Sequence, residues 1–116
     1  MAKLQEQAEQ FRHAYDVENC EENIRMQHQL IAEEFMEFMH AHQYESDDAV
    51  LKELVDLVYV CFQYAENRDW DLYVAYDRVH KSNMSKLGED GKPIRREDGK
   101  VLKGPNYAPP NLSDLV

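Results

Sequence analysis

The chain has 116 residues, of which 43% are hydrophobic and 31% charged, and its formal net charge is −10. This length allows one domain, and the composition is that of a folded protein rather than a disordered one. Such an acidic balance argues against a nucleic-acid polymer or a membrane surface as a partner, because both require basic patches.

No apolar run approaches the roughly 18 residues needed to span a bilayer, and the first residues contain no apolar signal-peptide core. The two cysteines, Cys20 and Cys61, are too few for a disulfide framework. From these observations we expect a cytoplasmic protein without a membrane partner.

Glycine and proline divide the chain into two parts. All four glycines and all four prolines lie between Gly88 and Pro110. Residues 1–87 carry 18 acids and 8 bases, whereas residues 88–116 carry five of each. Because glycine and proline interrupt helices, the pattern predicts an acidic helical body over 1–87. A neutral, turn-rich segment of the same domain follows over 88–116.

Two helices are predicted in the first part of the body. Apolar residues at steps of four, three and four predict a helix from about residue 3 to 16. A second helix is predicted over about 21–44, with Asn19 as its N-cap. Glu21 and Glu22 then fall in its first turn, where negative charge is favourable.

Two further helices and a turn-rich tail complete the prediction. Ser46 followed by two aspartates favours the start of a third helix that runs to about residue 67. A fourth helix is expected over about 71–86, ending before Gly88. Two short extended runs around Asp98 and Gly99 predict a hairpin with a three-residue turn, and the proline-rich residues after it predict an extended arm.

The third helix contains an unusual acid. Residues 54–65 are apolar on nearly every side, which predicts burial on more than one face of the helix. Asp56 lies within this stretch, and Glu53 precedes it by three residues, on the same face. Two ionised carboxylates in apolar surroundings require a compensating cation.

The second helix repeats this arrangement. Glu34 and Glu37 are three residues apart, Glu33 lies one turn before Glu37, and apolar residues flank all three. Two helices that each offer such a pair would form an all-oxygen site of the kind that Mg²⁺ or Mn²⁺ prefers. Two alternatives stay open at this point, namely acids on solvated helix faces and acids paired with lysine or arginine.

The chain resembles a known family. GluGluPheMetGlu at 33–37 and GluLeuValAsp at 53–56 match the carboxylate pattern of the all-α nucleoside triphosphate pyrophosphohydrolases. These include the MazG-like enzymes, the dimeric dUTPases and the phosphoribosyl-ATP pyrophosphohydrolases. HisLysSerAsnMetSerLysLeu at 80–87 and the tail after it are similar to the MazG-like and phosphoribosyl-ATP-pyrophosphohydrolase-like proteins of bacteria and phages. The similarity extends over about 11–112 and implies a four-helix bundle completed by oligomerisation.

The resemblance also implies roles for individual residues. The metal ligands would be four acids, and the preceding Glu33 would orient or deprotonate water. The substrate would be held by residues of the fourth helix and the tail. The implied metal ligands are Glu34, Glu37, Glu53 and Asp56, and the implied substrate contacts are Lys81, Asn83, Lys86, Arg96, Lys103 and Tyr107. Taken alone, Asn83 and Lys86 are also compatible with an ordinary helix C-terminus.

The resemblance implies metal-dependent hydrolysis of a nucleoside triphosphate to the monophosphate and pyrophosphate by a homodimer or homotetramer. A deoxynucleotide is the expected substrate, with dGTP one candidate, and a phage protein would act in the host cytoplasm. The non-enzymatic alternative is an acidic helical interaction module, such as an antitoxin or a nucleic-acid mimic. That alternative accounts for the net charge but not for an aspartate within the most apolar helix.

Overall fold

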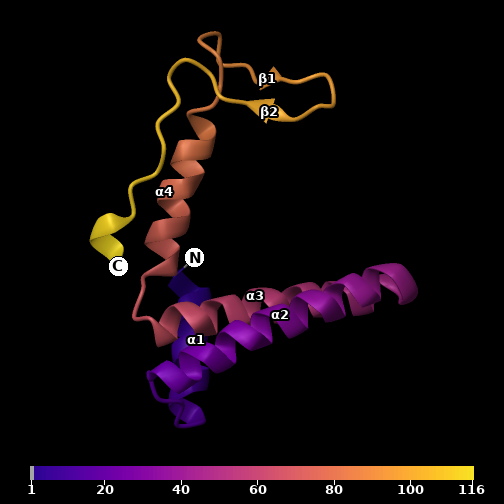
Figure 1. The fold of residues 1–116 in the computed structure, drawn as a ribbon, viewed down its shortest axis with the longest axis vertical. Coiled ribbons are helices and arrows are strands. Elements are labelled where there is room, and N and C mark those ends of the chain that lie inside the picture. Colours follow the sequence, from indigo (N-terminus) through magenta and orange to yellow (C-terminus); the bar gives the residue numbers. More distant parts are fainter. Residues whose placement is uncertain (1) are drawn as a thin grey trace. The chain divides into compact units, whose positions relative to one another are not determined.

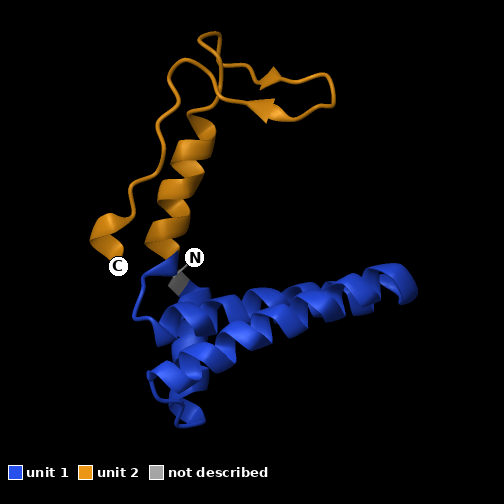
Figure 2. Cartoon of the chain, in the orientation of Figure 1, with its two compact units in different colours: residues 1–72 blue, residues 73–116 orange. Residues whose placement is uncertain are grey.

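The computed structural model describes residues 2–116 and is mostly helical, as predicted. Figure 1 shows its elements in chain order. They are helices α1 (Ala2–Ala14), α2 (Glu21–Tyr44), α3 (Asp47–Asn67) and α4 (Leu72–Met84), strands β1 (Ile94–Arg95) and β2 (Val101–Leu102), and the 3₁₀ turn η1 (Ser113–Leu115). The chain forms two compact units, one ending at Leu72 and the other spanning Tyr73–Val116 (Figure 2).

Helices α2 and α3 form an antiparallel helical hairpin in the first unit and lie side by side along their length (Figure 1). Two residues, Glu45 and Ser46, connect them. Ser46 is the N-cap of α3, as predicted, and its Oγ donates to Asp48 Oδ1 over 2.5 Å. Asp47 and Asp48 occupy the first turn, where the helix dipole favours negative charge. The hairpin therefore brings the middle of α2 beside the first half of α3.

The predicted N-cap of α2 was wrong. Cys20, in an extended conformation with φ −135° and ψ 164°, holds the cap position instead of Asn19. The side chain of Asn19 has another partner, because its Oδ1 accepts a hydrogen bond of 2.7 Å from Arg12 Nη2. A tertiary contact thus replaces the local capping bond that the sequence pattern suggested.

Helix α1 packs against α3 through a buried polar network centred on Arg12. Arg12 Nη1 donates to Gln63 Oε1 over 3.3 Å, and Nη2 donates to Asn67 Oδ1. Gln63 in turn donates from Nε2 to the carbonyl oxygen of Ala8 over 3.3 Å. Burial lowers the pKa of Arg12, and the charge of Glu66 partly opposes this shift. Amide and carbonyl oxygens thus supply the partners that a buried guanidinium requires.

Much of the apolar surface of α3 is exposed in the single chain. The sequence predicts burial on more than one face, but Val55 is 54% exposed and Leu51 61% exposed. Leu54, Val58 and Tyr59 are also exposed. Among the described residues the buried hydrophobic side chains are only alanines. One chain therefore does not cover α3, and a partner for this face remains a prediction.

The second unit contains α4 and the predicted hairpin. Strands β1 and β2 pair antiparallel, with Ile94 opposite Leu102. Beyond them Arg96 N–H donates to the carbonyl oxygen of Lys100 over 2.8 Å, which leaves three residues in the turn. Gly99 closes the turn with φ +90°, a conformation that disfavours residues with a Cβ. The three-residue turn is therefore confirmed.

The arm after the hairpin returns along α4 and is bound to it. Ser82 Oγ donates to the carbonyl oxygen of Ala108 over 2.7 Å, and the N–H of Ala108 donates to Ser85 Oγ over 3.0 Å. The backbone N–H of Gly104 donates to the carbonyl oxygen of Lys86 over 2.8 Å. The sequence did not predict the final turn η1. None of the helices built from residues 2–116 has the length and apolar character of a membrane span.

Candidate metal centre

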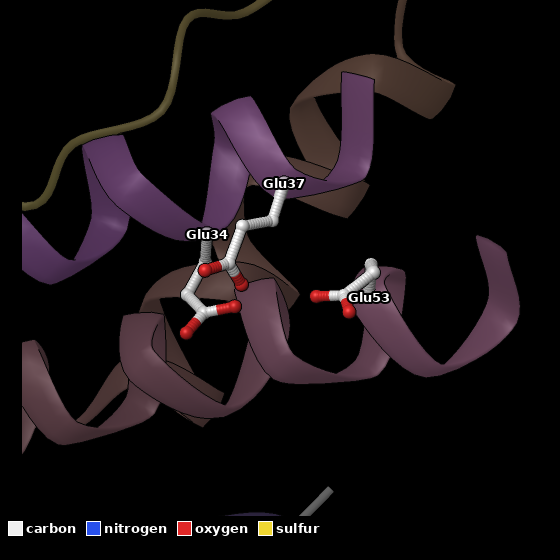
Figure 3. Close-up of side chains that lie close together, drawn as sticks. All are labelled: Glu34, Glu37 and Glu53. Carbon is white, nitrogen blue, oxygen red and sulfur yellow. The ribbon is translucent and has the colours of Figure 1, made fainter. Parts of the chain in front are cut away.

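Three glutamates converge where α2 and α3 lie side by side. Glu34 and Glu37 are one turn apart on α2, so they share a face of that helix. Glu53 comes from α3 and extends toward them, as Figure 3 shows. One carboxylate oxygen from each of the three lies within 4.8 Å of the other two. The predicted spacing on two helices thus produces one cluster of oxygens.

Two oxygens of this cluster are buried without a hydrogen-bond partner in the described part of the chain. They are Oε2 of Glu34 and Oε2 of Glu53. A buried carboxylate oxygen without a donor is costly, and a native structure normally provides a proton donor or a cation. The cluster therefore has the chemistry of an incomplete cation site.

The cluster also changes the acidity of Glu34. Burial is the main cause of a pKa raised to about 6, and the hydrogen bond and charge of Glu37 add to it. The charges of Asp56 and Glu53 raise this pKa further. All four candidate ligands thus interact electrostatically, and a divalent cation would relieve the repulsion among them.

Asp56 has a basic partner, so the pairing of an acid with lysine or arginine occurs at this position. Its Oδ2 lies 2.7 Å from Lys52 Nζ, one turn earlier on α3. Its carboxylate is outside the group of three whose oxygens meet. Its side chain is 33% exposed, whereas that of Glu53 is 18% exposed. The role of Asp56 as a ligand stays a prediction.

The other candidate residues are not members of the three-glutamate cluster. Glu33 is on α2 and exposed. The six candidate substrate residues all belong to the second unit. There Lys81 pairs with Asp77 at 2.8 Å, Arg96 pairs with Asp98, and Lys103 Nζ lies 4.8 Å from the ring centre of Tyr107. Asn83 is exposed and Lys86 half-buried. Their roles toward substrate stay predictions.

Two residues that the sequence pattern did not single out are prominent in the structure. Lys52 touches the acids of α3, and its position four residues before Asp56 was the available signal. Arg12 organises the buried network, and polar Gln63 and Asn67 one turn apart on an apolar helix were the signal for its partners.

The carboxylate cluster fits a hard divalent cation, since its donors are all oxygens and two of them are buried and unpartnered. The family model of phosphoribosyl-ATP pyrophosphohydrolase matches residues 2–83, which is most of the chain and includes all four candidate ligands. No curated protein matches the chain.

Proposed function

The chain belongs to the phosphoribosyl-ATP pyrophosphohydrolase family, and from this premise we propose that it hydrolyses a nucleoside triphosphate with a divalent metal ion. The family indicates a nucleotide pyrophosphohydrolase. The proposed products are a nucleoside monophosphate and pyrophosphate, and the proposed substrate is a deoxynucleotide, with dGTP one candidate. The observation that carries the proposal is the cluster of Glu34, Glu37 and Glu53 with its two unpartnered oxygens.

The net charge supports a role for a cation in the proposed activity. A triphosphate brings several negative charges to a chain that already carries −10. Glu34, Glu37, Glu53 and Asp56 would hold Mg²⁺ or Mn²⁺. A divalent cation bound there would neutralise phosphate charge and polarise the phosphorus under attack. Without it the four carboxylates would repel the substrate.

The residues of the chain would perform the rest of the reaction. The oxygen of a water molecule would bond to the α-phosphorus. At the same time the bond would break between that phosphorus and the oxygen that bridges it to the β-phosphorus. The pyrophosphate takes the electron pair of the broken bond. Glu33 is the proposed acceptor of the proton that the water loses, because a carboxylate can act as a general base.

Basic residues of the second unit would bind the phosphates. Lys81, Lys86 and Arg96 are proposed to hold the departing pyrophosphate, with Asn83 as a hydrogen-bond donor. Lys103 and Tyr107 are proposed as contacts of the tail with the substrate. Lys81 and Arg96 have acidic partners in the structure, so each would exchange an aspartate for a phosphate.

The exposed face of α3 supports a proposed homodimer or homotetramer. A second copy would cover the apolar side chains that one chain leaves in water. We propose no nucleic-acid polymer and no membrane as a partner, given the acidic balance of the chain.

The proposal is tested by a screen of the common nucleoside and deoxynucleoside triphosphates with Mg²⁺ and Mn²⁺. The measured quantity is the pyrophosphate that is released. We expect metal-dependent release from at least one nucleotide and none in the presence of a chelator. Absence of release from every nucleotide would favour the acidic interaction module instead.

A further inference from the structure

One ammonium group contacts both candidate ligands of α3. Lys52 Nζ lies 2.7 Å from Asp56 Oδ2 and 3.6 Å from Glu53 Oε1. Glu53 is also a member of the three-glutamate cluster. In the described part of the chain, Glu34 and Glu37 form no ion pair with a base, so the contact of the cluster with a positive charge is the one between Glu53 and Lys52.

We propose that Lys52 is a tethered counter-ion of the metal centre, which occupies the acidic site until a divalent cation displaces it. This inference rests on the proposed metal-dependent function. A divalent cation binds carboxylate oxygens directly and at short range. The ammonium of Lys52 uses oxygens of the same two carboxylates, and it would repel the ion at such separations. The two cations therefore compete for Glu53 and Asp56.

The exposure of Lys52 makes such an exchange possible. Its side chain is 68% exposed, so its ammonium can turn into water without loss of packing. The Glu53 side chain is only 18% exposed and stays in place for the incoming ion. The exchange thus costs one exposed ion pair and leaves the carboxylates where they are. Lys52 would therefore weaken the binding of a free divalent cation. It would also limit the repulsion between the acids while no such cation is bound.

An ordinary helix pair makes a different prediction. Lys52 and Asp56 are four residues apart, a spacing at which opposite charges stabilise a helix by themselves. A pair with only that role would stabilise the protein to the same extent with and without metal. A tethered counter-ion stabilises it only when metal is absent, because the bound ion takes over its role.

Direct titration with Mn²⁺, in which electron paramagnetic resonance detects the free ion, separates these two roles. We expect Lys52→Gln to bind Mn²⁺ about three- to tenfold more tightly than the wild type. Lys52→Arg keeps the charge and should stay close to the wild type. Arg25→Gln is the matched control, because it removes an exposed charge that pairs with Glu21 at 4.0 Å. It should change the affinity less than twofold.

Thermal unfolding gives a second readout that does not depend on activity. In a chelator, Lys52→Gln should unfold at a lower temperature than the wild type, and saturating Mn²⁺ should abolish the difference. The inference is overturned if Lys52→Gln binds Mn²⁺ like the wild type, if Arg25→Gln tightens binding equally, or if the thermal difference persists in Mn²⁺. If neither the wild type nor Lys52→Gln binds Mn²⁺, the proposed function fails as well, so the two failures are distinguishable.

Discussion

Arg78 of α4 and Asp114 of η1 form a two-pronged ion pair. Nη1 lies 2.5 Å from Oδ1 and Nη2 lies 3.0 Å from Oδ2. The same guanidinium donates from Nη1 to the carbonyl oxygen of Asn111 over 3.1 Å. A bidentate pair of this kind fixes orientation as well as distance. The carboxyl-terminal arm is therefore held on α4 at its end as well as near Gly104.

The close approach at Gly104 predicts that Gly104→Ala releases the arm. A Cβ there would lie 2.3 Å from the carbonyl oxygen of Leu87 and 2.7 Å from that of Lys86, both backbone atoms. We expect the Ala108 amide to exchange with solvent about tenfold faster, which corresponds to about 1.4 kcal/mol. Gly91→Ala is the control for backbone strain alone, because its φ of +75° disfavours a Cβ although nothing lies within 4 Å of the added carbon. Unchanged protection in Gly104→Ala would contradict the tight contact.

Loss of a candidate metal ligand should abolish turnover. Glu37→Ala or Asp56→Ala removes a charge that would hold the cation against the phosphates, so we expect kcat to fall by about a hundredfold or more. Without metal, Glu37→Ala should be at least as stable as the wild type, because repulsion between acids decreases. Asp56→Ala also loses its ion pair with Lys52, which opposes that gain. Glu22→Ala, in the first turn of α2, is the control. Near wild-type pyrophosphate release in both ligand variants would exclude these assignments.

The raised pKa of Glu34 predicts a pH dependence of stability. Its usual pKa is 4.5 and its value in the fold is about 6. Between these values the folded chain binds more protons than the unfolded chain, so this group's contribution to stability decreases as pH rises through the window. Glu66, whose pKa burial also raises, contributes in the same direction.

Thermal unfolding of the wild type and of Glu34→Gln in a chelator at pH 5 and pH 7 isolates the contribution of Glu34. The wild type should lose about 2–5 °C more than the variant between these two conditions. Mg²⁺ should reverse the additional loss at pH 7. Parallel changes in the two proteins would show that Glu34 titrates normally.

The buried network predicts a large effect at Arg12. Arg12→Ala leaves the oxygens of Gln63, Asn67 and Asn19 without their donor. We expect a loss of about 2–4 kcal/mol in the free energy of unfolding, measured with urea. Arg25→Ala removes only an exposed pair and should cost less than about 0.5 kcal/mol. A cost at Arg12 as small as that at Arg25 would mean that the network does not stabilise the docking of α1.

The exposed apolar face of α3 predicts an assembly that a charge should disrupt. At micromolar concentration, light scattering should give the wild type the mass of a dimer or a tetramer. Val55 is 54% exposed in the single chain, so Val55→Asp should raise the dissociation constant about thirtyfold or more and keep the helices. Glu45→Gln, in the α2–α3 connection, is the control. A monomeric wild type would contradict the prediction that this face of α3 joins two copies of the chain.

The hairpin and its carboxylates could be predicted because their signals are local. The start of α3 is marked by adjacent residues, namely Ser46 before two aspartates. The two glutamate spacings on α2 and α3 follow from helix periodicity alone. The pairing of the helices then brings Glu34, Glu37 and Glu53 together.

The remaining features depend on contacts between distant residues. Asn19 has a good capping sequence but binds Arg12, which the sequence cannot indicate without the docking of α1. Asp56 is different, because its partner Lys52 lies only four residues away. The i,i+4 spacing alone does not decide between this ammonium group and a divalent cation as the partner of Asp56. The end of the arm depends on Arg78, which is 36 positions from Asp114.

The position of the prolines separates two timescales of refolding. All four lie in the second unit, and the α2–α3 hairpin closes through a connection of only two residues. Contacts between neighbours in sequence form quickly, and a segment without proline has no slow peptide isomerisation to wait for. After dilution from denaturant, helical signal from the hairpin should return in milliseconds. Docking of the arm should show an additional phase of tens of seconds that a prolyl isomerase accelerates.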